Sequence, residues 1–108
     1  MSLQTSHHQL ITLPVRMSRA ETPTLRQQLA TLIAEGRHQL VLDLHQVRHI
    51  DASGLSVLLS AYFALQPHGG RLVLLSPSAE VRARLVPARL HRLFEVYEDA
   101  DSALAACA

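Results

Sequence analysis

Two short, largely apolar runs on either side of one helical pattern constrain this chain most. Residues 39–44 and 71–75 are too short to stand alone as helices and too continuous for half-exposed strands, so they predict buried strands. Between them, apolar side chains recur at helical spacing, at Leu55, Leu58, Leu59, Tyr62 and Phe63. A strand, a helix and a strand in this order predict a right-handed unit with adjacent parallel strands.

The N-terminal part adds one strand and one helix to this unit. Residues 9–15 are expected to form a strand, and Pro14 places it at an edge or near its end, because proline cannot donate to a ladder. Ser18 and Glu21 have the spacing of a capping box, in which each side chain satisfies the other residue's N–H group. The helix that follows would end at Gly36 and would bury Leu25, Leu29, Leu32 and Ile33.

Turn signals also divide the C-terminal part. Ser76 reads as an N-cap with Pro77 at the first helical position, which opens a helix through about residue 86. Residues 93–97 are expected to form a last strand and residues 99–107 a last helix with acidic residues at its beginning. The predicted fold class is α/β, with a small, mostly parallel sheet of about four strands and four helices packed against it.

Composition fits one domain over residues 1–108, in which residues 1–8 are expected to be poorly ordered or to form a short edge strand. Hydrophobic residues make up 48% of the chain and charged residues 18%, as in chains that fold around a core. The single cysteine, Cys107, has no partner for an internal disulfide, which favours a reducing compartment. No apolar stretch approaches the roughly 20 residues that span a bilayer, and no signal peptide is visible. We therefore expect a soluble, cytoplasmic protein without membrane insertion.

Charge and motif content argue against several classes of function. The formal net charge is only +1 and the arginines are scattered, so nucleic acid is not an expected partner. Of the seven histidines, His45 and His49 lie four apart in a connector, where that spacing does not bring side chains to one face, and we expect no metal site. His7 and His8, near the terminus, are expected to be disordered. Without a serine elbow or a phosphate-binding glycine loop, the chain is expected to be neither an enzyme nor a cofactor binder.

The start of the long helix carries the one candidate site, at Asp51-Ala52-Ser53-Gly54-Leu55. In open α/β sheets, sites form at the carboxyl ends of the strands, and this segment follows a buried strand. A purely structural explanation also fits, with Asp51 as the cap, Ser53 in the first turn and Gly54 for close packing. Spacing alone favours the structural explanation and leaves the functional one open.

The same residues carry a resemblance to a known family. The chain resembles the STAS domain of bacterial anti-sigma-factor antagonists in four places: the buried run 40–44, the motif 51–55, the stretch 69–74 and Leu93-Phe94. The spacing between the buried run and the motif also resembles the family. The likeness extends more weakly to residues 13–25. It implies a small sheet with helices packed against it and a function in binding. In the family, an unphosphorylated antagonist captures an anti-sigma factor, often a serine kinase, and so frees a sigma factor; phosphorylation at the helix start breaks this capture.

The resemblance implies a partner-binding surface made of Ser18, Arg19, Asp51, Ala52, Ser53, Gly54 and Leu55. Two departures from the family pattern lie within it. The usual phosphoacceptor is a hydroxyl residue directly after the aspartate, and this chain has Ala52 there, so Ser53 is the only acceptor left in the motif. It lies about 100° further around the helix. Where many members have an aspartate at the start of the first helix, this chain has Ser18, which keeps the cap but not the charge.

The expected function is therefore antagonism of an anti-sigma factor or serine kinase of the same cell, in transcription regulation and signalling. Because Ala52 replaces the usual phosphoacceptor, this antagonism is expected to be able to work without the phosphoswitch. Two alternatives stay open: an accessory subunit that docks onto the ATPase of a lipid-transporting ABC system, and a scaffold subunit of a STAS signalling assembly. A homodimer is also compatible with the sequence.

Overall fold

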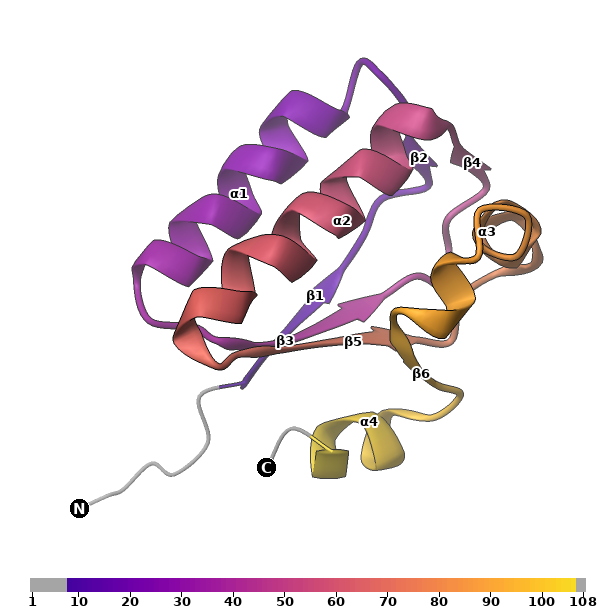
Figure 1. Cartoon of the computed structure of the whole chain (residues 1–108). Coiled ribbons are helices and arrows are strands. Elements are labelled where there is room, and N and C mark those ends of the chain that lie inside the picture. The colour runs from indigo at the N-terminus through magenta and orange to yellow at the C-terminus, as the bar shows by residue number, and fades with distance from the viewer. Residues whose placement is uncertain (1–7, 107–108) are drawn as a thin grey trace.

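The computed structural model describes residues 8–106, whose centre is a four-stranded, fully parallel sheet (Figure 1). Its strands are β1 (His8–Thr12), β3 (Gln39–Asp43), β5 (Arg71–Leu75) and β6 (Glu95–Tyr97), in the order β1-β3-β5-β6. The predicted buried strands are thus confirmed as adjacent and parallel, with Val41 opposite Val73. The predicted N-terminal strand is at the sheet edge. The expectations for residues 1–7, with His7, and for Cys107 lie outside the described residues.

Helices cover both faces of the sheet (Figure 1). The helices α1 (Thr22–Ala34) and α2 (Ala52–Leu65) lie side by side on one face, and α4 (Ala100–Ala106) lies on the other. Because side chains alternate along a strand, Leu40 and Leu42 enter the core under α1 and α2, while Val41 packs with Ala103 of α4. The α/β class with four helices and a four-stranded parallel sheet is therefore confirmed.

The buried face of α2 differs from the predicted one. Leu58 is fully buried as expected, but the helix centres its inner face on Gly54, Val57, Ala61 and Leu65, and Phe63 is 60% exposed. The placement of Phe63 on the buried face was wrong. The reason is close packing: the small residues Gly54 and Ala61 face the core, which turns Phe63 outward.

The beginning and the end of α1 test the helix signals of the sequence. Gly36 has a φ of +91° and ends the helix as predicted. The capping box is only half formed: the Ser18 N–H donates to Glu21 Oε1 at 3.1 Å, but the Ser18 hydroxyl donates to the same oxygen at 2.6 Å instead of accepting an N–H. The helix begins only at Thr22, because a turn over residues 18–21 follows the extended backbone at Met17.

The helix α3 (Ala79–Leu85) starts later than predicted. Its cap is Ser78, whose hydroxyl accepts the Val81 N–H at 3.3 Å and donates to the Val47 carbonyl at 2.7 Å. The predicted start at Ser76 and Pro77 was wrong. Ser76 instead has a φ of +51° and donates its N–H to the Tyr97 carbonyl at 2.7 Å, which extends the contact between β5 and β6.

Smaller elements complete the fold. The short 3₁₀ helices η1 (Gln66–His68) and η2 (Leu90–Arg92) precede β5 and β6. A second parallel pair joins β2 (Arg16–Met17) to β4 (His49–Ile50). The sequence analysis assigned no element to residues 16–17 and placed residues 49–50 in a connector. Two-residue strands are too short to show an alternating pattern, so they left no signal. No helix among residues 8–106 has the length and apolarity to cross a membrane.

Candidate functional site

Asp51 is the N-cap of α2 and joins two separate segments of the chain. Its Oδ1 accepts the Gly54 N–H at 3.1 Å, as predicted for a cap, and its Oδ2 accepts the Arg19 N–H at 3.2 Å. These N–H donors, Gly54 first, hold the pKa of the Asp51 carboxyl below its usual value, because they stabilise the charged form. One carboxylate thus fixes the start of α2 beside the turn that leads into α1.

Gly54 lets the strand β2 approach the first turn of α2. A Cβ at this position would lie 2.4 Å from the Met17 carbonyl oxygen and 2.7 Å from Ile50 Cγ1, which is closer than real Cβ atoms come. Met17 itself is fully buried. The glycine of the motif is therefore required by packing, in agreement with the structural explanation from the sequence.

The residues of the motif divide into exposed and buried ones. Ala52 is exposed and Ser53 is half-buried, and the Ser53 hydroxyl makes no hydrogen bond with any residue that the structure describes. Gly54 is buried, and the half-buried Leu55 packs against the core. Ala52, Ser53 and Leu55 therefore keep some side-chain surface exposed, whereas Gly54 does not.

Ser18 and Arg19 lie in the turn next to this helix start, so the structure brings the two halves of the predicted surface together. Arg19 is exposed, whereas Ser18 is half-buried and bonded to Glu21. The hydrogen bonds from the Ser18 hydroxyl and backbone lower the pKa of the Glu21 carboxyl. Both carboxylates nearest the helix start, Asp51 and Glu21, are thus engaged inside the molecule.

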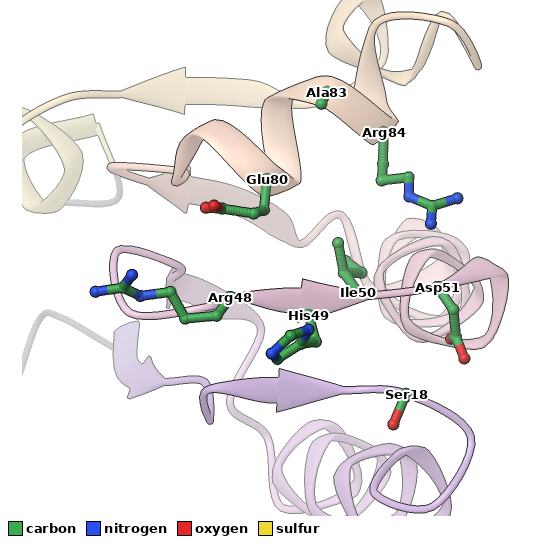
Figure 2. A pocket seen from close by; sticks show the side chains of 8 residues that line it. All are labelled: Ser18, Arg48, His49, Ile50, Asp51, Glu80, Ala83 and Arg84. Carbon is green, nitrogen blue, oxygen red and sulfur yellow. The ribbon is translucent and has the colours of Figure 1, made fainter.

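A groove of about 420 Å³ runs from this helix start along β4, between α3 and β2 (Figure 2). Figure 2 shows Arg84 extending from α3 toward the end where Asp51 lies, and Arg48 extending toward the other end. The lining residues are Ser18, Arg48, His49, Ile50, Asp51, Glu80, Ala83 and Arg84. Sequence reasoning did not identify Arg48, His49, Glu80 and Arg84 as residues of the site. Arg48 and His49 precede Asp51 without a recognisable motif, and Glu80 and Arg84 lie on α3, which comes next to β4 only in the folded chain.

Metal-ligating clusters are not found among residues 8–106. No group of three or more histidine, cysteine, aspartate or glutamate side chains comes together there. His45 contacts Asp43 through Nδ1 and Oδ1, 2.8 Å apart, and His49 lies in β4, so the two histidines are not paired with each other. The helix start leaves Arg19 and Ala52 exposed, and the half-buried Ser53 has a hydroxyl without a hydrogen bond among the described residues.

Comparison with known proteins gives one family and a set of similar folds. A family model described as the STAS domain matches residues 3–103. A search of curated proteins finds no match. Among solved structures, a Thermotoga maritima protein has a TM-score of 0.86 at 19% identity, covering 94% of this chain and 87% of that one. An anti-sigma factor antagonist from Mycobacterium paratuberculosis has a TM-score of 0.84 at 22% identity, with coverages of 97% and 89%.

The Bacillus cell fate determinant SpoIIAA, solved in its phosphorylated form, has a TM-score of 0.72 at 20% identity and covers 94% of this chain and 92% of its own. At these identities the likeness establishes a shared fold. The sheet and helix arrangement described above is therefore found in known antagonists of anti-sigma factors.

Proposed function

The chain belongs to the STAS domain family, and from this premise we propose that it is an anti-sigma-factor antagonist. It binds an anti-sigma factor of the serine-kinase type and thereby releases a sigma factor. It acts as a binding protein, without catalysing a reaction. The contact surface is the end of the molecule where the start of α2 meets the turn before α1.

One observation carries this proposal: Asp51 accepts hydrogen bonds from Gly54 and from Arg19, which lie in different segments. A surface for protein recognition needs fixed geometry, because ordering flexible segments on binding costs free energy. The two hydrogen bonds supply that order before the partner arrives. They hold Ala52 and Ser53 at the surface beside Arg19.

Regulation is expected to depart from the family pattern, because the exposed position after the aspartate is Ala52, whose methyl group cannot accept a phosphoryl group. We expect the native chain to remain competent for binding without a switch, so that its activity is set by its abundance or by its partner. Ser53 is the alternative acceptor, since the residue is half-buried rather than enclosed and its hydroxyl makes no hydrogen bond within residues 8–106.

A second candidate function is also supported by Ala52. A STAS subunit that docks onto the ATPase of a lipid-transporting ABC system needs no phosphoswitch, and a residue without a hydroxyl suits that role. The same surface would then contact an ATPase in place of an anti-sigma factor.

Direct titration separates the two candidates. The chain is titrated calorimetrically with the serine-kinase-type anti-sigma factor of the same cell and, separately, with a STAS-associated ABC ATPase of that cell. Saturable binding to the anti-sigma factor that displaces sigma supports the proposal. Binding to the ATPase alone would replace it by the second candidate.

A further inference from the structure

The groove along β4 carries two arginines that form no ion pair with any residue from 8 to 106. The chain has ten arginines and no lysine. In residues 8–106, Arg71 pairs with Glu95 and Arg82 pairs with Glu98, whereas Arg48 and Arg84 form no ion pair. Both line the groove and both are exposed. A guanidinium group presents a planar fork of N–H donors that matches a carboxylate.

The acidic groups at this end do not neutralise the two arginines. Asp51 is engaged by backbone N–H groups of Gly54 and Arg19, and Glu21 by Ser18. Glu80 lies one turn before Arg84 on α3, a spacing at which opposite charges often pair. Figure 2 shows Glu80 pointing away from Arg84, and no ion pair joins them. The basic groups of the groove are thus left for an external partner.

The backbone segments that carry Arg48 and Arg84 are held in place, which favours a partner of defined geometry. The backbone N–H of Arg48, the residue before β4, donates to the Val15 carbonyl at 2.8 Å, so the backbone that carries this side chain is held in place. The cap Ser78 anchors the start of α3, which carries Arg84, to the Val47 carbonyl at 2.7 Å. The two guanidinium groups therefore project from fixed elements at the two ends of a groove that opens beside Asp51.

We propose that this groove receives an acidic segment of the partner protein, whose carboxylates pair with Arg48 and Arg84. This inference rests on the proposed function, because it names the chemistry of the partner at the same end of the molecule. It also gives a physical role to residues outside the family motif. Electrostatic complementarity of this kind speeds association and selects partners, and it weakens with salt.

The first test uses defined probes and needs no knowledge of the partner. The ¹⁵N-labelled chain is titrated by NMR with octaglutamate, with octaglutamine, and with a single-stranded DNA octamer. Octaglutamate should shift the Nε–H signals of Arg48 and Arg84 and the amide of His49, and octaglutamine should not. No localised shift with octaglutamate, or tighter binding of DNA at the same residues, would overturn the proposal.

Charge reversal provides the matched variants. Arg48→Glu and Arg84→Glu should each raise the dissociation constant for octaglutamate and for the anti-sigma factor about tenfold or more. Arg37→Glu makes the same charge change after the end of α1, far from β4 in Figure 1, and should leave both constants within about twofold. Folding of all three variants is checked by circular dichroism and thermal unfolding.

The outcomes separate this inference from the proposed function. If the anti-sigma factor binds the native chain and both groove variants equally well, the function stands and the acidic segment is excluded. If the native chain does not bind the anti-sigma factor, the proposed function fails, and the octaglutamate titration still decides whether the groove takes an acidic segment.

Discussion

The Asp51 carboxylate accepts the backbone N–H of Arg19 at 3.2 Å, a contact between residues 32 positions apart in the chain. It ties the turn before α1 to the start of α2. Because its other oxygen caps α2 through Gly54, a single side chain sets both the helix start and its neighbouring turn. The motif therefore has a structural role that supports its proposed role in binding.

Asp51→Asn should lower the free energy of unfolding at neutral pH, because the amide cannot provide a charged acceptor for both N–H groups. The pKa of Asp51 is lowered in the folded chain, so its stabilising effect is present above the ordinary aspartate pKa of about 3.9. It is lost as the pH falls through the lowered pKa. Urea unfolding at pH 7 and at acid pH should show a difference between native and variant that narrows on acidification.

Asp101→Asn is the control for this series, because the exposed Asp101 of α4 accepts no side-chain hydrogen bond within residues 8–106. It should leave stability nearly unchanged at neutral pH. A gap between native chain and Asp51→Asn that stays constant with pH would contradict the role of the charged cap.

Gly54→Ala should destabilise the fold by about 1 to 3 kcal/mol through overpacking. The added methyl group would collide with the Met17 carbonyl oxygen and with Ile50 Cγ1. Ser53→Ala, in the same helical turn, should change stability by about 0.5 kcal/mol or less. Equal stability of the two variants in denaturant unfolding would mean that β2 can move away from α2 without cost.

Leu58→Ala should cost about 2 to 5 kcal/mol, because it removes buried methyl groups and leaves a cavity. Leu58 is fully buried, while Phe63 on the same helix is 60% exposed. Phe63→Ala is therefore the matched control and should cost much less. Comparable losses for both in thermal unfolding would show that the inner face of α2 is placed incorrectly.

Much of the sheet was predictable from the sequence because its strands leave a local signal. The inner residues of β3 and β5 are consecutively apolar, since both faces of the sheet are covered. The face of α2 was harder to predict, because hydrophobicity alone favoured Phe63 over Ala61. Close packing at small residues determines which face of α2 is buried, and small residues give no signal in a periodicity pattern.

The candidate site was predictable only where it is local. Asp51 as a cap and Gly54 as a packing residue follow from the order of residues at a helix start. The groove could not be found in this way, because Arg84 on α3 comes to line the same groove as Arg48, the residue before β4, only in the folded chain. Tertiary contacts of this kind depend on the whole fold, and no short segment encodes them.

Ala52→Ser should create a phosphoacceptor. Serine is close to alanine in size, the position is exposed, and the N-terminal end of α2 favours an added phosphate. After incubation with the cognate kinase and ATP, intact mass should show one phosphate on Ala52→Ser and none on the native chain. Phosphate on the native chain that disappears in Ser53→Ala would make Ser53 the acceptor and exclude the unswitched form.

The most direct measurement is a calorimetric titration of the serine-kinase-type anti-sigma factor with three forms of the chain: native, Ser53→Asp and Ser60→Asp. Ser53→Asp adds a charge beside Asp51 at the proposed contact surface, and Ser60→Asp adds the same charge about two turns further along α2. The proposed function predicts binding of the native chain, a loss of about tenfold or more in affinity for Ser53→Asp, and little change for Ser60→Asp. Equal affinities for all three forms, or no binding of the native chain, would contradict it.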